Sequence, residues 1–185
     1  MDKLLVLING LPGSGKSTLG RSLAVALDAQ FLSKDAIKEA LATAIGNVVG
    51  ASALGGIAMD TVWALAQATP TTVVVDSWWF RPRDLQFARA GIERVGPDRV
   101  VEVWCDVPSG VARSRYASRR RAVLHQDEQR LANDWDAWAE WAAPLGLAPV
   151  VVADTTRPVD CIALATRIER VVMAPIAASS TPVRP

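Results

Sequence analysis

The stretch Gly10-Leu11-Pro12-Gly13-Ser14-Gly15-Lys16-Ser17 decides the fold, because it matches the pattern G-x-x-x-x-G-K-[ST]. The apolar run at residues 4–8 comes directly before it and is typical of a buried strand. Residues 16–28 follow with apolar side chains on one helical face, so a helix is expected there. The pattern requires a strand, a loop and a helix in that order. The sequence therefore predicts a phosphate-binding loop.

Each residue type in this loop suits a triphosphate. Backbone N–H groups can approach phosphate oxygens only where side chains are absent, and Gly13 and Gly15 permit that approach. Lys16 is predicted to reach the β- and γ-phosphates, Ser17 to bind Mg²⁺ through its hydroxyl, and Thr18 to face the α-phosphate. The Asn-Lys-x-Asp signature of guanine-binding proteins is absent from the sequence, which favours ATP. The residues of this stretch expected to bind the nucleotide are Gly10, Pro12, Gly13, Ser14, Gly15, Lys16, Ser17 and Thr18.

Working outward from the loop, further apolar runs at residues 72–75, 100–105 and 150–153 predict buried strands, and Phe31-Leu32 is a candidate fifth. Helical patterns lie between these runs, and Pro82, Pro108 and Pro158 are each expected to open a helix. This alternation predicts an α/β, three-layer P-loop fold of the kinase type, with a five-stranded parallel sheet covered by helices on both faces. A chain of 185 residues has room for one such domain, to which residues 1–175 are assigned.

Three segments depart from the plain alternation. Residues 36–70 are predicted to form a helical insert that shapes a substrate pocket, interrupted and mobile where Gly46, Gly50, Gly55 and Gly56 gather. Residues 108–130 are predicted to form a helical lid. Residues 176–185 are rich in Ser, Thr and Pro, which predicts a flexible tail.

The composition is that of a globular protein, with 50% hydrophobic and 21% charged residues. The net charge of +1 gives no overall field that would favour nucleic acid or an anionic membrane surface. Cys105 and Cys161 lack the spacing of a zinc or redox site, so buried thiols are expected. The run at residues 4–8 is too short for a signal segment or a membrane span. We therefore expect a cytoplasmic protein without a membrane partner.

Two carboxylates stand at the ends of predicted strands, the edge of an open α/β sheet where ligands bind. Asp35 follows Phe31-Leu32 and opens a helix, so it is either an N-cap or the base that takes a proton from an attacking hydroxyl. Asp76 ends the run at residues 72–75 and is either a turn residue or a ligand of Mg²⁺. Ser77 stands where many motor ATPases place a glutamate that activates water, which favours transfer to a substrate over hydrolysis.

Five arginines crowd the predicted lid helix and its extension, and Arg115 and Arg119 share a face at i, i+4 spacing. Such a cluster is a solvated basic face, a nucleic-acid groove, or a lid whose arginines stabilise charge on a transferring phosphate. The five are Arg113, Arg115, Arg119, Arg120 and Arg121.

The remaining aromatic and imidazole side chains carry weaker signals. His125 has no neighbour at triad or metal spacing and is expected to be a surface or lid residue. Trp135, Trp138 and Trp141 recur at helical spacing, which is typical of core packing. Trp78 and Trp79 are consecutive, so they cannot both face one buried side, and at least one is a candidate for the wall of the acceptor pocket.

The chain resembles, over most of its length, the small P-loop kinases related to chloramphenicol phosphotransferase, zeta toxin and gluconate kinase. The motifs that carry this resemblance are Gly10-x-x-Gly13-x-Gly15-Lys16-Ser17-Thr18, Ser33-Lys34-Asp35, Val75-Asp76, Arg115-x-x-x-Arg119 and Asp154-Thr155-Thr156. The resemblance implies that Asp35 is the general base, that Arg115 and Arg119 are lid arginines, and that the turn at Asp154 and Thr155 lies beside the adenine.

The predicted activity is transfer of the γ-phosphoryl group of Mg-ATP to a hydroxyl of a small molecule, such as an antibiotic or a sugar. The residues expected to act in catalysis are Asp35, Lys16, Arg115 and Arg119, and those expected to bind Mg²⁺ are Ser17 and Asp76. Two alternatives remain open. The first is a regulatory switch that binds ATP without an acceptor, and the second is a polynucleotide kinase, which would need a continuous basic groove.

Overall fold

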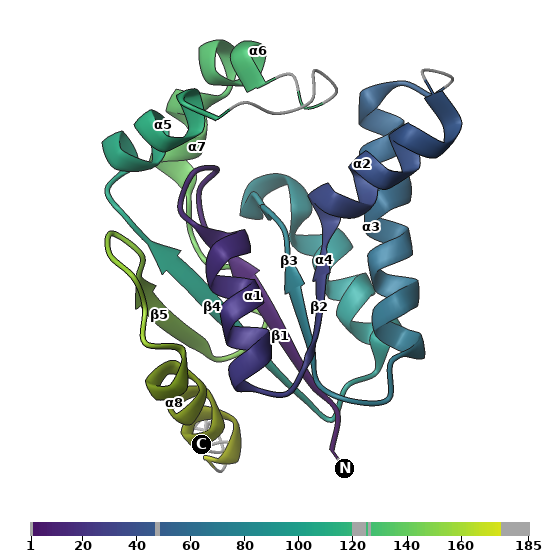
Figure 1. The fold of residues 1–185 in the computed structure, drawn as a ribbon, viewed down its shortest axis with the longest axis vertical. Helices are drawn as coiled ribbons and strands as arrows, with labels where there is room; N and C mark the ends of the chain where they lie inside the picture. The colour runs from purple at the N-terminus through teal and green to yellow at the C-terminus, as the bar shows by residue number, and fades with distance from the viewer. Residues whose placement is uncertain (1, 47–48, 120–124, 126, 175–185) are drawn as a thin grey trace, which may run out of the picture.

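The structure is a computed structural model that describes residues 2–46, 49–119, 125 and 127–174. Its centre is a five-stranded, all-parallel sheet in the order β2-β3-β1-β4-β5 (Figure 1). The strands are β1 (Leu4–Asn9), β2 (Gln30–Ser33), β3 (Val73–Asp76), β4 (Arg99–Asp106) and β5 (Val150–Asp154). The expectation of five parallel strands, including one at Phe31-Leu32, is confirmed.

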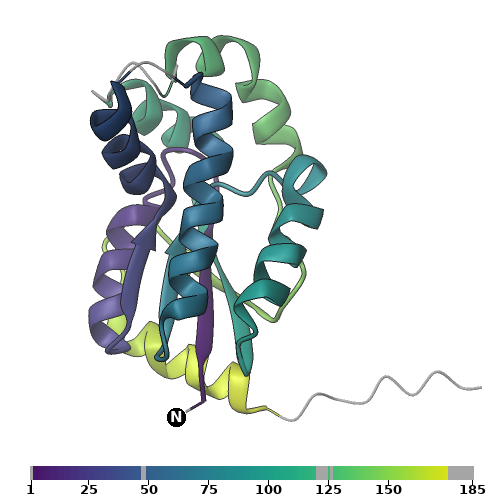
Figure 2. The same cartoon turned by 90° about the vertical axis from the view of Figure 1, so that its right-hand side faces the viewer.

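Eight helices lie among the described residues. They are α1 (Lys16–Ala26), α2 (Lys34–Ile45), α3 (Ala51–Ala68), α4 (Arg81–Val95), α5 (Ser109–Ala117), α6 (Asp127–Asn133), α7 (Trp135–Trp141) and α8 (Cys161–Met173). Helices α1 and α8 pack on one face of the sheet, and α3 and α4 pack on the other (Figures 1 and 2). The predicted three-layer α/β fold is confirmed.

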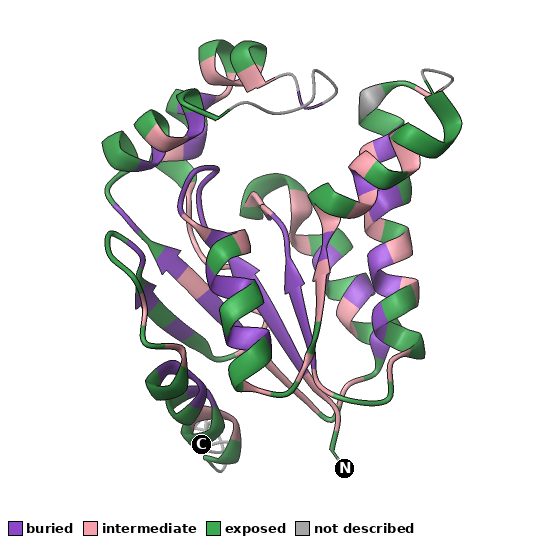
Figure 3. Cartoon of the chain, viewed as in Figure 1, coloured by how far each residue is buried: buried purple, intermediate pink, exposed green. Residues whose placement is uncertain are grey.

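The central strand shows why its sequence is apolar without a break. Val6 and Ile8 face the core beneath α1 and α8, whereas Leu5 and Leu7 face the core beneath α3 and α4. All four side chains are almost fully buried, as Figure 3 shows for the centre of the sheet. A strand covered on both faces has no solvent side on which a polar residue would be favoured.

The strands end together at the edge where α5, α6 and α7 lie, away from the N-terminus (Figure 1). Asp76 at the end of β3 is in register with Ile8 of β1 and with Ser33 of β2. A third apolar cluster joins Leu11 of the phosphate-binding loop to Ala112 and Tyr116 of α5 and to Trp138 of α7. This cluster fixes the helices above the loop.

Several local expectations need correction. Helix α3 runs without a break through Gly55 and Gly56, so the interruption lies only between α2 and α3, where residues 47–48 are outside the described part. Pro82 lies in the first turn of α4, as expected, whereas Pro108 is the N-cap of α5 and Pro158 precedes α8. Helix α3 tolerates Gly55 and Gly56 because its apolar face is packed on the sheet, and Pro70 follows its C-cap Thr69.

The tryptophan stripe is only partly buried. Trp135 and Trp138 are core residues, but the Trp141 side chain is 59% exposed because it lies at the last residue of a short helix. Cys105 is buried, whereas Cys161 at the start of α8 is only half-buried. The expectation of full burial for Trp141 and Cys161 is therefore wrong.

The assignment of residues 1–175 to one domain, with an insert at 36–70 and a lid at 108–130, remains a prediction. The predicted tail at 176–185 lies outside the described residues. Across the described part of the chain, every helix is too short or too polar to cross a membrane.

Candidate active site

The phosphate-binding loop connects β1 to α1 and depends on its glycines, of which two show the reason. Gly13 and Gly15 have φ angles of +88° and +94°, a region that side chains disfavour. A Cβ atom on Gly13 would also overlap the backbone carbonyl of Ala112 in α5. Gly15 is the N-cap of α1 and makes no side-chain capping bond, so the first N–H groups of the helix have no acceptor within it. Together these groups form an anion-binding site at the positive end of the helix dipole.

Lys16 supplies the positive charge of the loop. Its side chain is buried, and Nζ donates to the carbonyl oxygens of Gly10 at 2.8 Å and Leu11 at 2.9 Å. Burial lowers the pKa of the Lys16 ammonium, and the carboxylate of Asp76 opposes that shift. The ammonium also lies 5.9 Å from the centre of the Trp78 ring, so an aromatic face borders the site.

Asp76 brings a carboxylate to the same place. It is 96% buried at the end of β3, accepts a hydrogen bond from the hydroxyl of Ser33 at 3.3 Å, and is hydrogen-bonded by the side chain of Ser17. Burial raises the pKa of the Asp76 carboxyl, and the positive charge of Lys16 counters the rise. The turn-residue alternative does not fit a side chain that is buried among loop and strand residues.

Asp35 is the second residue of α2, and the N-cap of this helix is Ser33, whose hydroxyl accepts a hydrogen bond from Ala36 N at 3.5 Å. The capping role considered for Asp35 therefore belongs to Ser33. The Asp35 side chain is exposed, lines the main cavity and interacts electrostatically with Lys16 and Asp76.

A cavity of about 730 Å³ starts at the phosphate-binding loop and extends between α2, α3 and α4. Lys16, Ser17, Asp35, Asp76 and Arg119 line it, so one cavity brings together residues that the sequence predicted separately. Its further walls include Lys34, Lys38, Met59, Asp60, Trp63, Trp78, Trp79, Arg83, Asp84, Phe87, Gly91, Arg94, Tyr116, His125, Asp127 and Arg130.

Both tryptophans singled out in the sequence lie on the wall of this cavity, but they differ in burial. Trp79 is almost fully buried and stacks on Trp63 of α3, with ring centres 6.2 Å apart. Trp78 is half-buried and packs against Phe80 and Trp138. Trp78 therefore offers an aromatic face beside Lys16, while Trp79 supports the wall from behind.

The structure separates the two predicted lid arginines. Arg115 donates from its guanidinium to the carbonyl oxygens of Thr155 at 2.9 Å and Thr156 at 3.0 Å, and it is not part of the cavity wall. Arg119 lines the cavity, and its charge acts on Lys16. Arg120 and Arg121 lie outside the described residues.

The turn after β5 is stabilised by its own residues and by the end of β4. The Asp154 carboxylate accepts hydrogen bonds from the N–H of Thr156 at 2.9 Å and from its hydroxyl at 2.5 Å, and these bonds lower the pKa of Asp154. Thr155 donates from its N–H and hydroxyl to the carbonyl of Asp106 at 2.9 and 3.0 Å. A Cβ atom on Gly15 would lie 3.8 Å from Thr155, so this turn borders the phosphate-binding loop.

His125 is 94% buried, and its Nε2 lies 2.7 Å from Oε1 of Glu39 in α2. The expectation of a surface histidine is therefore wrong. The alternative, a residue of the predicted lid at 108–130, is compatible with this contact, which joins His125 to a residue 86 positions earlier in the chain.

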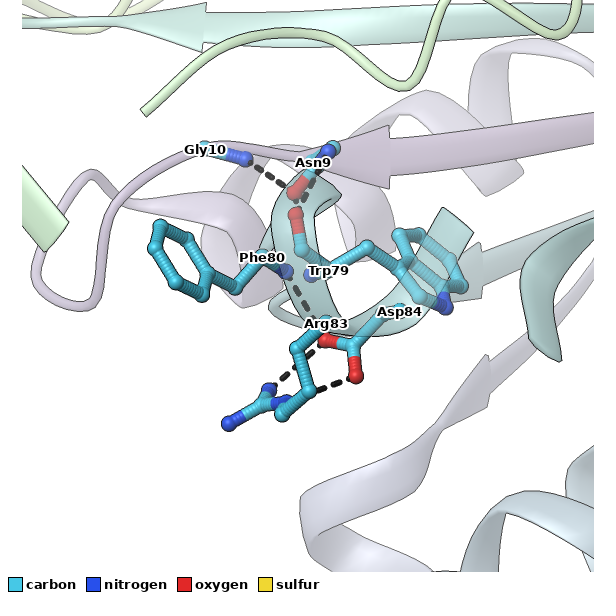
Figure 4. Close-up of polar contacts among 6 residues, drawn as sticks. All are labelled: Asn9, Gly10, Trp79, Phe80, Arg83 and Asp84. Carbon is cyan, nitrogen blue, oxygen red and sulfur yellow. Dashed lines mark hydrogen bonds and ion pairs between the residues drawn. The ribbon is translucent and has the colours of Figure 1, made fainter. Parts of the chain in front are cut away.

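Asn9, at the end of β1, is a site residue that sequence reasoning missed. Its Oδ1 accepts hydrogen bonds from the N–H of Gly10 at 2.8 Å and of Trp79 at 3.2 Å (Figure 4). Its Nδ2 donates to the carbonyl of Trp79 at 3.3 Å and to Oε1 of Glu102 at 2.9 Å. This one amide therefore joins the phosphate-binding loop to the cavity wall.

Glu102 holds Asn9 in that orientation. It is fully buried on β4, and its carboxylate also accepts from the N–H groups of Leu145 at 2.9 Å and Gly146 at 3.2 Å. The available signal in the sequence is a glutamate inside the otherwise apolar run at residues 100–105, because a charge is rarely buried there without hydrogen-bond partners.

Comparisons with known proteins agree with this geometry. The profile of the AAA domain family matches residues 5–145. A candidate kinase from Chloroflexus aurantiacus is 20% identical with a TM-score of 0.72, over 92% of this chain and 99% of that one. The shikimate kinase of Bacteroides thetaiotaomicron is 17% identical with a TM-score of 0.56, over 90% and 97% of the two chains. The gluconokinase of Sinorhizobium meliloti is 17% identical with a TM-score of 0.56, over 89% and 93%. No curated protein sequence matched the chain.

Proposed function

This chain belongs to the AAA domain family with a P-loop kinase fold, and we propose that it transfers the γ-phosphoryl group of ATP to a hydroxyl of a small molecule. One observation carries the proposal: Lys16, Asp76 and Asp35 line the same end of one cavity, which then extends for a further substrate. Two solved structures with a similar fold are a shikimate kinase and a gluconokinase, and an acceptor of that kind, a small hydroxyl compound, is what we propose for this cavity.

The residues of the loop fit a nucleoside triphosphate. The positive φ angles at Gly13 and Gly15 expose backbone N–H groups, and Lys16 can move from its carbonyl acceptors to phosphate oxygens. The turn at Asp154 and Thr155 borders the loop and would accommodate the adenosine. This turn is not part of the cavity wall, so a nucleotide held there leaves the cavity available to the acceptor.

Ser17 and Asp76 would hold Mg²⁺. A hydroxyl and a carboxylate are oxygen ligands of the kind that Mg²⁺ prefers, and they are already in contact. Among the described residues no cluster of three or more acidic, histidine or cysteine side chains is placed to hold a metal, so phosphate oxygens and water would complete the coordination. The ion would neutralise charge on the phosphates.

Asp35 is our choice for the general base. Its exposed carboxylate lies in the cavity close enough to Lys16 and Asp76 for their charges to interact, so an acceptor hydroxyl between them could pass its proton to Asp35 as the oxygen attacks phosphorus. Lys16 and Arg119 would stabilise the negative charge on the transferring group. Arg115 would instead fix the turn at Thr155. ATP and Mg²⁺ are abundant in the cytoplasm, where we expect the enzyme to act.

The proposal is tested by measuring ADP release from Mg-ATP with purified protein across hydroxyl-bearing antibiotics, sugars, hydroxy acids, nucleosides and oligonucleotides, with mass spectrometry of the product. We expect a product heavier by one phosphoryl group. Asp35→Asn should lower kcat by about 10²- to 10⁴-fold and preserve ATP binding, whereas Lys16→Ala should abolish turnover.

The rival functions predict other results. Tight ATP binding without acceptor-stimulated turnover would favour a regulatory switch. Phosphorylation of oligonucleotide ends, with binding that weakens steeply in salt, would favour a polynucleotide kinase. Full activity of Asp35→Asn would mean that Asp35 is not the general base.

A further inference from the structure

One wall of the cavity is cationic. Lys34 is the first residue of α2, Arg83 is the third residue of α4, and Arg130 belongs to α6, and all three line the cavity. We call these three residues the cationic wall. Two of them stand in the first turn of a helix, where the helix dipole disfavours positive charge by a few tenths of a kcal/mol to about 1 kcal/mol. Local helix stability therefore does not explain why cations occupy these positions.

Lys34 is the centre of this wall. Among the described residues its ammonium makes no hydrogen bond or ion pair, although the side chain is only partly exposed. Burial lowers the pKa of Lys34, the carboxylates of Asp35 and Asp84 oppose the shift, and the charges of Arg83 and Arg130 add to it. The three cations therefore interact, and two of them repel the third.

Arg83 forms an ion pair with Asp84 that orients its guanidinium. Its Nε and Nη2 donate to the two oxygens of Asp84 at 2.7 and 2.6 Å, and Asp84 also accepts from the N–H of Phe80 at 2.8 Å (Figure 4). The pair is side-on, and the Arg83 side chain is 50% exposed whereas that of Asp84 is 16% exposed. Further guanidinium N–H groups of Arg83 are therefore left for another acceptor. Asp84 thus anchors Arg83 to the start of α4.

The charge of Asp134 acts on Arg83 but is not among those that act on Lys34, and the remaining carboxylates near the wall have other roles. Asp127 accepts a hydrogen bond from the hydroxyl of Tyr116 at 2.7 Å, and Asp35 is the base in the proposed mechanism. Asp60 is exposed on α3, and its charge is not among those that act on Lys34. An anion bound between Lys34, Arg83 and Arg130 would relieve their repulsion and give the Lys34 ammonium a partner.

We propose that the acceptor of this enzyme carries an anionic group, a carboxylate or a phosphate ester, which Lys34, Arg83 and Arg130 bind while an acceptor hydroxyl faces Asp35. This inference rests on the proposed function and narrows it from hydroxyl compounds in general to hydroxy acids and phosphorylated alcohols. The aromatic face of Trp78 then borders the carbon skeleton between the two polar ends.

The test compares matched compounds that differ in the anionic group. The pairs are D-gluconate with sorbitol, shikimate with its methyl ester, and glycerol 3-phosphate with glycerol. ADP release gives kcat and KM, and tryptophan fluorescence of protein saturated with a non-hydrolysable Mg-ATP analogue gives binding. The variants are Lys34→Gln, Arg130→Gln and their double variant. Arg89→Gln is the control, because Arg89 is exposed on α4 and is not part of the cavity wall.

We expect at least one anionic compound to bind or react at least 10-fold better than its neutral partner. Each substitution in the cationic wall should raise its KM or dissociation constant by about 10- to 100-fold, as expected for a lost charged hydrogen bond, and Arg89→Gln should not. The carboxylate and phosphate pairs show which anion is preferred.

The outcomes separate the inference from the function on which it rests. Turnover or binding of neutral compounds alone, unchanged by the substitutions, would overturn the inference and leave the kinase proposal standing. Anion binding that the double variant abolishes, without turnover of any compound, would support the anion site and count against the kinase. Absence of any preference for anionic compounds in both measurements would overturn the inference.

Discussion

The substitution Glu102→Gln tests whether the buried network below the phosphate-binding loop acts as described. The native carboxylate only accepts hydrogen bonds, and it accepts them from Asn9 Nδ2, Leu145 N and Gly146 N. Glutamine has one oxygen and one NH₂ group. If its oxygen stays on Asn9 and Leu145, its NH₂ group meets the N–H of Gly146, so two donors face each other.

The cost follows from that mismatch. A buried donor without an acceptor costs about 1–3 kcal/mol, and the remaining two bonds weaken because the acceptor is no longer charged. In a chain of this size each kcal/mol lowers Tm by about 2–4 °C, so a fall of roughly 2–12 °C is expected.

The assay is thermal denaturation of the ligand-free protein followed by circular dichroism. Glu93→Gln is the matched control, because Glu93 is exposed on α4 and its loss should leave Tm within about 1 °C of the wild type. Kinase activity should be measured as well, because an Asn9 side chain that has lost its bond to Glu102 no longer holds Trp79 in place. Unchanged Tm in Glu102→Gln, or a shift equal to that of the control, would refute the assignment of Glu102 as the acceptor of these three hydrogen bonds.

Three further predictions follow from single contacts. Arg115→Ala should raise KM for ATP by about 10-fold with little change in kcat, because the two hydrogen bonds of Arg115 hold the turn beside the loop. Arg119→Ala should mainly lower kcat. Steady-state kinetics in which both variants change KM and kcat equally would contradict this prediction. Gly13→Ala should destabilise the fold by more than about 1–2 kcal/mol, since it adds a clash with α5 to the strain of a φ of +88°; a wild-type denaturation curve would disprove it. Burial raises the pKa of Cys105 from 9.0 to about 12, so the stability contributed by the protonated thiol is fully present below pH 9.0 and is lost as the pH rises towards 12. At pH 8 a thiol reagent should therefore modify Cys161 in the native protein, and reaction of Cys105 before denaturation would be the opposite result.

The parts of the fold that could be predicted are those in which local sequence and tertiary burial agree. The apolar run at residues 4–8 became β1 because both faces of the central strand are covered, so apolar residues are favoured at every position. The glycines of the loop were predictable for a related reason, since positive φ angles select glycine whatever the rest of the chain does. Asp76 followed from its place at the end of such a run.

The roles that could not be predicted depend on partners far along the chain. Arg115 and Arg119 have the same charge and an i, i+4 spacing that predicted one helical face, but α5 ends at Ala117, before Arg119. Arg115 is distinguished by its hydrogen bonds to the carbonyls of Thr155 and Thr156. Those partners are 40 and 41 residues away, and no periodicity within a helix encodes them. The same holds for Asn9 and Glu102, which are 93 residues apart.

The groups that would handle phosphate and those that would bind the acceptor are therefore held in place by different parts of the fold. This difference affects which of them can be substituted without loss of stability. Groups that would handle phosphate are buried at the edge of the sheet, since Asp76 ends β3 and Lys16 opens α1 and bonds to the loop that follows β1, so a substitution there disturbs buried structure. Groups that would choose the acceptor, such as Lys34 and Arg130, project from helices into the cavity and are less buried. Exchanging the latter should alter the acceptor at little cost in stability. Stability measurements on the cationic-wall variants would show this directly, because a large fall in Tm would mean that these charges support the fold rather than select a ligand.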